Sequence, residues 1–235
     1  MITYGANISL FPLNVVLFPG MMLPLHIFEK RYQIMIKECI NSDDQIFGVI
    51  LAKTKQAQAS GVAKLYMDDL YDIGTSARIT AAEHLSDGRM NLITVGHERF
   101  VIKAIRASEN DFLIGQVDPF LMEGRDDNEK IDHMTQKLRP LVKEYIEQLG
   151  AASGEDLSNT VLPTDPQALA YLAGAAVQGP LQEKQHLLSA ESLSSLITRT
   201  VNIIGKENQI LGYMIKAYRA HQQVQKLPFV DYSLN

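Results

Sequence analysis

Histidines and paired carboxylates are the side chains of this sequence that could hold a metal ion or transfer protons. The six histidines are scattered, and none has the H-E-x-x-H spacing that places two imidazoles on one face of a helix. His97-Glu98 comes closest, but it lies between two strand-like runs, and we interpret His97 as a residue at a turn or strand end. Asp43-Asp44 and Asp68-Asp69 are interpreted as solvated turns, because calcium sites and catalytic carboxylates need several converging oxygens. We therefore expect no metal site and no catalytic residue.

Cys39 is the single cysteine of the chain, so an internal disulfide or a cysteine-rich metal site is impossible. It falls on the apolar face of a predicted helix, where a free cysteine normally behaves as a small buried hydrophobe. We interpret Cys39 as a packing residue, and we expect no cofactor.

The segment FPLNVVLFPGMMLPLHIFEKRY, residues 11–32, gives the strongest local prediction. Pro12, Pro19 and Pro24 fix φ and lack a backbone donor, so the segment must run as short extended pieces, with its sharpest turn at Pro19-Gly20. Beyond the last of these prolines, apolar positions recur at helical spacing. The sequence thus predicts a strand, a turn, a second strand and a helix.

Short apolar runs of strand length dominate the rest of the first half. They lie at 46–53, 71–82, 90–95, 100–107 and 112–120, and Asp87-Gly88 marks a hairpin. Strands of this kind with one early helix suggest a small barrel, since closure removes exposed edges. After residue 127 the apolar positions follow steps of three and four, and Asp165-Pro166 is a strong helix start. The second half is therefore predicted to be a helical bundle that packs onto the β part.

Composition favours a compact soluble protein. The apolar share of 46% is ample to fill one or two cores. No apolar run approaches the roughly 20 residues that cross a bilayer, and the N-terminus lacks a signal-like pattern, so we expect a cytoplasmic protein without membrane contact. The formal net charge is −5, and both halves are net negative.

The opening segment and three later stretches together resemble one protein family. The first of these is Asp72–Ile79, the second is Asp87-Gly88 followed by Leu92–Phe100, and a weaker one is Lys184–Leu188. In order and spacing they resemble the amino-terminal substrate-binding domain of Lon-type ATP-dependent proteases, and in particular its free-standing versions. The resemblance implies an α+β fold, in which an N-terminal β-rich PUA-like pseudobarrel with one early helix is followed by a C-terminal helical bundle. We expect the β-rich subdomain to comprise residues 1–122 and the α-helical subdomain to comprise residues 123–235.

Two groups of residues in the opening segment have both a structural and a functional interpretation. Met21-Met22-Leu23 either plug the barrel or form a surface that accepts varied apolar side chains, because unbranched thioethers repack easily. Glu29 would complement the positive end of the helix, and Arg31 would pair with a carboxylate from the barrel. The family instead suggests that Glu29-Lys30-Arg31 form a polar rim beside a peptide-binding surface. We favour the structural interpretation for the charged residues and leave the methionines open.

Catalytic parts of Lon proteases have no counterpart in the sequence. There is no G-x-x-x-x-G-K-[ST] loop to cradle phosphates, and no glycine-flanked serine with an activating lysine. The chain stops at Asn235, before such modules would occur, so we expect neither ATP hydrolysis nor proteolysis.

The leading hypothesis is a non-catalytic module that binds exposed apolar segments of unfolded or extended polypeptides. It would act alone or as an adaptor or chaperone-like factor beside a separate protease or chaperone. Binding would use an apolar groove near Pro19 or an exposed strand edge. The candidate peptide-binding residues are Pro19, Met21, Met22, Leu23, Phe28, Glu29, Lys30 and Arg31.

Two alternatives come from other classes of protein. The first is an RNA-binding PUA-like protein, but the dispersed basic residues and negative charge argue against nucleic acid as a partner. The second is a small enzyme of unrecognised type, for which no nucleophile, base and orienting group can be joined.

Overall fold

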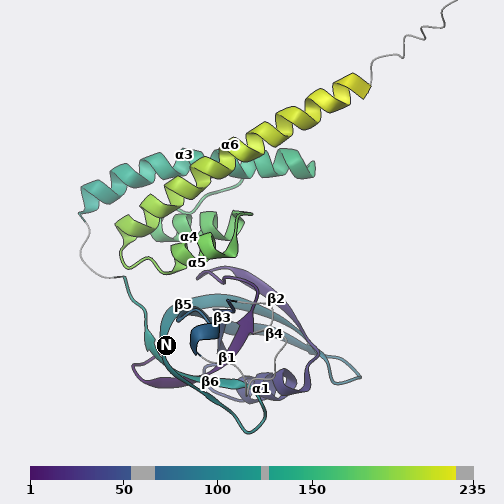
Figure 1. Ribbon diagram of the computed structural model, residues 1–235, viewed down its shortest axis with the longest axis vertical. Coiled ribbons are helices and arrows are strands. Elements are labelled where there is room, and N and C mark those ends of the chain that lie inside the picture. Colours follow the sequence, from purple (N-terminus) through teal and green to yellow (C-terminus); the bar gives the residue numbers. More distant parts are fainter. Residues whose placement is uncertain (54–66, 123–126, 226–235) are drawn as a thin grey trace, which may run out of the picture.

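A computed structural model describes residues 1–53, 67–122 and 127–225 of the chain (Figure 1). In these residues six strands and the helix α1 come first, and four helices of different lengths follow. This order of strands and helices confirms the predicted α+β class. In chain order the elements are β1 (Ala6–Leu13), β2 (Met22–Ile27), α1 (Lys30–Ile40), β3 (Ile46–Leu51), the 3-10 turn η2 (Met67–Asp69), β4 (Ile73–His84), β5 (Met90–Ala107), β6 (Leu113–Pro119), α3 (Asn128–Ser153), α4 (Pro166–Ala176), α5 (Leu181–Leu188) and α6 (Leu193–Gln225).

Five of the strands close into a ring. β5 pairs with β4, β4 with β3, β3 with β1, β1 with β6, and β6 returns to β5. β1 and β3 run parallel, whereas the other pairs are antiparallel. β2 lies outside the ring and pairs only with β5 among the described strands. Closure of the ring removes most of the free edges that an open sheet would expose.

The long strand β5 differs from the sequence prediction. Separate strands were expected on either side of His97-Glu98, but β5 runs without a break from Met90 to Ala107. The ladder to β4 shifts register at this point, because Thr75 faces Arg99 and Ala77 faces Gly96. One extra residue of β5 is therefore accommodated in a β-bulge, which bends a strand and increases its twist. The bend lets one strand pair with β2 at its start and with β6 at its end.

The helices form two layers over one end of the barrel. α4 and α5 lie between the barrel and the crossing pair α3 and α6, and α6 extends beyond the other elements (Figure 1). The core of the helical part continues into the barrel, because it includes the buried barrel residues Val16, Phe18, Leu51 and Ile73. None of the described helices is long and apolar enough to span a bilayer.

Predicted helix signals appear at the start of α4. The Asp165 carboxylate accepts a hydrogen bond of 2.7 Å from the backbone N–H of Ala168, and Pro166 occupies the first turn. The carboxylate satisfies one of the backbone donors that a helix start leaves unpaired, and Pro166 has no N–H that would need a partner. The sequence prediction of this helix start is confirmed.

Candidate functional site

The tight turn predicted at Pro19-Gly20 joins β2 to the rest of the barrel. The N–H of Met21 donates to the carbonyl oxygen of Phe18 at 3.0 Å, and Gly20 has a φ of 80°, which together define a type II turn. Gly20 donates to the carbonyl oxygen of Gly96 at 2.8 Å, and Gly96 donates to that of Met21 at 2.9 Å. The turn is thereby fixed to the bulged part of β5.

β2 presents alternate residues to solvent and to the core. Met22 is 63% exposed, and Phe28, which follows the strand, is 64% exposed. Pro24 is exposed between them, and its partner on β5 is Ile93, which is 43% exposed. We call Met22, Pro24, Phe28 and Ile93 the outer β2 stripe. At the usual rise per residue of a strand the stripe is roughly 20 Å long.

The other predicted residues near this turn face different directions. Leu23 is buried in the core that α1 shares with the barrel, and Met21 packs partly against the same core. The two interpretations of the methionines therefore apply to different residues: Met21 fills the core, and Met22 lies on the surface. Pro19 is half-buried and lines a cavity beside Arg99 instead of the outer β2 stripe.

β2 is an edge strand, and its proline limits how that edge can be used. The odd-numbered residues Met21 and Leu23 direct their carbonyl groups to β5, because these oxygens accept hydrogen bonds from the backbone N–H of Gly96 and the side-chain hydroxyl of Thr94. Backbone groups alternate in an antiparallel strand, so those of Pro24 face outward, where a further strand would have to pair. Pro24 lacks the N–H that such a strand would need, as is usual for proline in edge strands.

The charged residues at the start of α1 form a structural cluster. The Arg31 side chain is largely covered and makes ion pairs with Glu29 at 2.8 Å and with Asp111 at 4.0 Å. Its guanidinium carbon lies 4.7 Å from the centre of the Tyr32 ring. Burial raises the pKa of Tyr32 to about 12, although the neighbouring Arg31 acts in the opposite direction. Arg31 thus makes the pair with a barrel carboxylate that the structural interpretation requires, whereas Lys30 is exposed.

A polar network that the sequence analysis missed lies within the outer β2 stripe, between Pro24 and Phe28. Nδ1 of His26 lies 2.8 Å from Oδ1 of Asn91, whose amide donates to Glu83 at 2.9 Å. Nη1 of Arg89 lies 3.5 Å from the other ring nitrogen of His26, and the His26 ring stacks on that of Phe28. The alternation of side chains along β2 could have placed His26 on the same face as Met22, but the partners from β4 and β5 depend on strand register.

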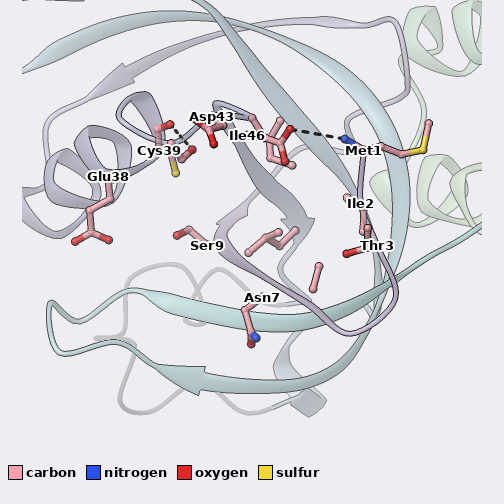
Figure 2. Close-up of a pocket in the computed structure, with 13 residues that line it drawn as sticks. Met1, Ile2, Thr3, Asn7, Ser9, Glu38, Cys39, Asp43 and Ile46 are labelled. Atoms are coloured by element: carbon pink, nitrogen blue, oxygen red, sulfur yellow. Dashed lines mark hydrogen bonds and ion pairs between the residues drawn. The ribbon is translucent and has the colours of Figure 1, made fainter.

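A hollow of about 430 Å³ lies between β1, the end of α1 and the start of β3 (Figure 2). Glu38 and Asp43 line it, but Figure 2 shows that their carboxylates do not point toward one another. Burial raises the pKa of Cys39 to about 11, which keeps its thiol protonated and unreactive. Within the described ranges, no three His, Cys, Asp or Glu side chains are grouped to hold a metal ion. This hollow offers no arrangement for catalysis.

Comparison with protein families gives one match along most of the chain. Residues 7–206 match the family described as the ATP-dependent protease La (LON) substrate-binding domain.

Curated relatives include "Lon protease 2" of Myxococcus xanthus, which is 29% identical over 235 residues, covering 94% of this chain and 27% of that protein. "Lon protease" of Anaeromyxobacter dehalogenans is 27% identical over 244 residues, covering 97% of this chain and 28% of that protein. The chain therefore spans little more than a quarter of the length of these relatives.

Solved structures that share the fold include two Lon N-terminal domains. The N-terminal domain of the Mycobacterium avium complex Lon protease has a TM-score of 0.61 at 18% identity, covering 87% of this chain and 98% of its own. A Lon N-terminal domain protein from Xanthomonas campestris has a TM-score of 0.57 at 20% identity, covering 84% and 98%. At these identities the likeness extends to the fold alone.

Proposed function

Because the chain belongs to the family of ATP-dependent protease La (LON) substrate-binding domains, we propose that it is a non-catalytic module that recognises exposed apolar segments of unfolded or extended polypeptides. The observation that carries this proposal is the outer β2 stripe. Met22 and Ile93 are exposed on neighbouring strands whose opposite faces are buried, and Phe28 is exposed directly after β2. Large exposed apolar side chains gathered on one face are typical of interaction sites.

The dimensions and chemistry of the stripe suit an extended apolar segment. A length of roughly 20 Å corresponds to about six residues of an extended chain. Met22 at one end can adapt to different side chains, because a thioether repacks at little cost. Phe28 at the other end offers an aromatic face, and His26, which stacks on Phe28, would offer a polar contact within the stripe.

Side-chain contacts are favoured over strand addition. A polypeptide pairing with the outer edge of β2 would meet Pro24 in the middle of the strand and lose one backbone hydrogen bond. The outer face of β2 has no such defect. We therefore place the polypeptide across the stripe and not along the edge of the sheet.

A role as adaptor beside a separate protease or chaperone in the cytoplasm is part of the same proposal. The family match covers the substrate-binding domain, and the sequence contains no phosphate-binding loop, which supports a non-catalytic role for these residues. The alternative of an RNA-binding PUA-like protein finds no support in the family match, and the net charge of −5 is unfavourable for phosphate contacts.

A titration of a labelled, permanently unfolded polypeptide tests the proposal. The double variant Met22→Asp/Phe28→Asp should bind at least about tenfold more weakly, because burial of each large apolar side chain contributes roughly 1.5–3 kcal/mol. Its melting temperature should match that of the unchanged protein, since both side chains are exposed. The control Val161→Asp alters an apolar residue that is 91% exposed and lies outside the stripe. Binding no stronger than that of an inert globular protein would contradict the proposal, and salt-sensitive retention on RNA would favour the alternative.

A further inference from the structure

A second cavity, of about 710 Å³, lies between the barrel and the helical part. Its walls come from the N-terminal segment, the bulged part of β5, the residues that follow β6, and α4. Most of the lining is apolar, with Ile2, Pro19, Phe120, Leu121 and Met122 among its members. A cavity of this size suits a ligand of one to a few residues, since ligand sites typically measure about 300–1,000 Å³.

Arg99 gives this cavity its charge. The residue is only 5% exposed, and its guanidinium carbon lies 4.6 Å from the centre of the Phe120 ring. Nη1 donates two hydrogen bonds, to the carbonyl oxygens of Leu188 at 2.6 Å and Ala190 at 2.7 Å, at the end of α5. These bonds use both hydrogens of Nη1. We call the cavity of about 710 Å³ that Arg99 lines the Arg99 cavity.

The rest of the guanidinium has no partner in the described part of the chain. Nε and Nη2 of Arg99 make no hydrogen bond there, and no carboxylate lies within ion-pair distance. Among the described residues, the fully enclosed side-chain atoms that lack a partner are Oε1 of Gln148 and Oδ1 of Asn208, so Nε and Nη2 of Arg99 retain contact with open space. Arginine stays protonated, and a buried positive charge without a counter-ion is costly.

The other charged groups at the cavity do not neutralise Arg99. The carboxylate of Glu98 accepts a hydrogen bond of 2.8 Å from the backbone N–H of Ile2, and its second oxygen lies 3.7 Å from Nδ1 of His97. Glu98 therefore holds the N-terminal segment in place. Tyr171 lines the cavity as a neutral phenol, because burial raises its pKa.

We propose that the Arg99 cavity binds the C-terminal carboxylate of a polypeptide whose last residues are apolar. Nε and Nη2 of Arg99 would donate two parallel hydrogen bonds to the two carboxylate oxygens, the geometry that guanidinium groups favour. The last side chains would occupy the apolar walls near Phe120 and Leu121. This inference rests on the proposed function in one respect, that the ligand is a polypeptide, and it concerns a different surface.

The test compares a labelled hexapeptide that ends in Leu-Phe as the free acid with the same peptide as the C-terminal amide. Fluorescence anisotropy should give at least about tenfold tighter binding for the acid, because hydrogen bonds to charged groups are stronger than neutral ones. Equal affinities would overturn the proposal. Hexanoate tests whether any small carboxylate is sufficient for binding. If hexanoate binds as tightly as the peptide acid, the cavity does not recognise the C-terminus of a polypeptide.

Two variants locate the binding. Leu121→Glu places a negative charge at the mouth of the cavity on a residue that is 65% exposed, and it should weaken binding of the acid at least about tenfold. Val161→Glu is the matched control and should leave the affinity unchanged. Arg99→Met should abolish the difference between acid and amide. If this variant does not fold, because Arg99 also holds the end of α5, Leu121→Glu alone decides, and unchanged binding of the acid in that variant would overturn the proposal.

The stripe variant separates this inference from the proposed function. Met22→Asp/Phe28→Asp should keep the preference for the acid over the amide, because neither residue lines the Arg99 cavity. Loss of the preference in this variant would overturn the proposal. If the unfolded polypeptide binds the unchanged protein but acid and amide bind equally, the proposed function stands and the Arg99 cavity has another role.

Discussion

The carbonyl oxygen of Phe18 lies so close to Gly96 that a Cβ atom added there would be 2.2 Å from that oxygen. This distance is far below any real contact of a Cβ atom, and the obstacle is backbone, which cannot rotate away. The two hydrogen bonds between Gly96 and the turn before β2 depend on the same approach. Attachment of β2, and with it the outer β2 stripe, therefore requires glycine at position 96.

We expect Gly96→Ala to destabilise the protein by about 2–4 kcal/mol, the range of substitutions that force a steric conflict in a buried site. Urea denaturation followed by circular dichroism measures the free energy of unfolding. Gly205→Ala is the matched control, because Gly205 lies inside α6 and a Cβ there would meet no atom within 4 Å. This change should stabilise the protein by about 0.5–1 kcal/mol. Equal stability of Gly96→Ala and the unchanged protein would refute the close approach.

Alkaline pH should destabilise the fold. Burial raises the pKa of Cys39 from 9.0 to about 11 and that of Tyr32 from 10.0 to about 12. As pH rises, the unfolded chain loses these protons first, so the stabilisation is complete below about pH 9 and is lost between about pH 9 and 12. Each shift corresponds to roughly 2–3 kcal/mol of unfolding free energy. Urea denaturation at a series of pH values measures the decline.

Tyr32→Phe is the control for this pH dependence. It removes the phenol but keeps the ring that packs against Phe11. The decline above pH 10 should become shallower in this variant. A free energy of unfolding that stays constant up to pH 11 in the unchanged protein would be incompatible with the raised pKa values.

Alkylation of Cys39 should be slow in the folded protein. A pKa raised to about 11 lowers the thiolate fraction at pH 8 by about a hundredfold relative to a pKa of 9, and burial restricts access further. Iodoacetamide labelling followed by mass spectrometry should show at least that ratio between the rates in concentrated urea and in buffer. Rapid labelling of the folded protein would mean that Cys39 is exposed or activated.

The cap of α4 should contribute measurably to stability. Asp165→Ala removes the acceptor for the N–H of Ala168 and should cost about 1 kcal/mol, whereas Asp165→Asn retains a side-chain oxygen and should cost less. Thermal melts of the two variants measure the difference. If both variants melt together, the hydrogen bond is not the source of the stabilisation.

Local signals in the sequence were sufficient to predict the turn and the helix start whose conformations depend on a few neighbouring residues. Proline and glycine at positions 19 and 20 fix a turn whatever surrounds them, and Asp165-Pro166 begins a helix for reasons contained in two residues. The continuity of β5 was missed because Gly96 and the polar residues after it read as a turn, whereas they form a bulge held by β4 and by the turn before β2.

Parts of the candidate site depend on contacts between distant residues, which no local pattern reveals. Ile93 joins the outer β2 stripe only through its pairing with Pro24, and Arg31 is held by Asp111 from the loop before β6. The alternation along β2 did contain the information that Met22 and Leu23 face opposite sides. The sequence placed Arg99 in a family motif but did not predict its burial or its partners. The carbonyl groups of Leu188 and Ala190, to which it donates, lie about ninety residues further along the chain.

The core shared by the barrel and the helices has a consequence for cooperativity. Separation of the two parts near residue 122 would expose Phe18 and Ile73 and would break the hydrogen bond of 2.8 Å from the Gln185 side chain to the Ile73 carbonyl oxygen. We therefore expect the two parts to unfold together. A polypeptide held by the barrel alone would therefore also delay the melting of α4 and α5, through a common unfolding transition.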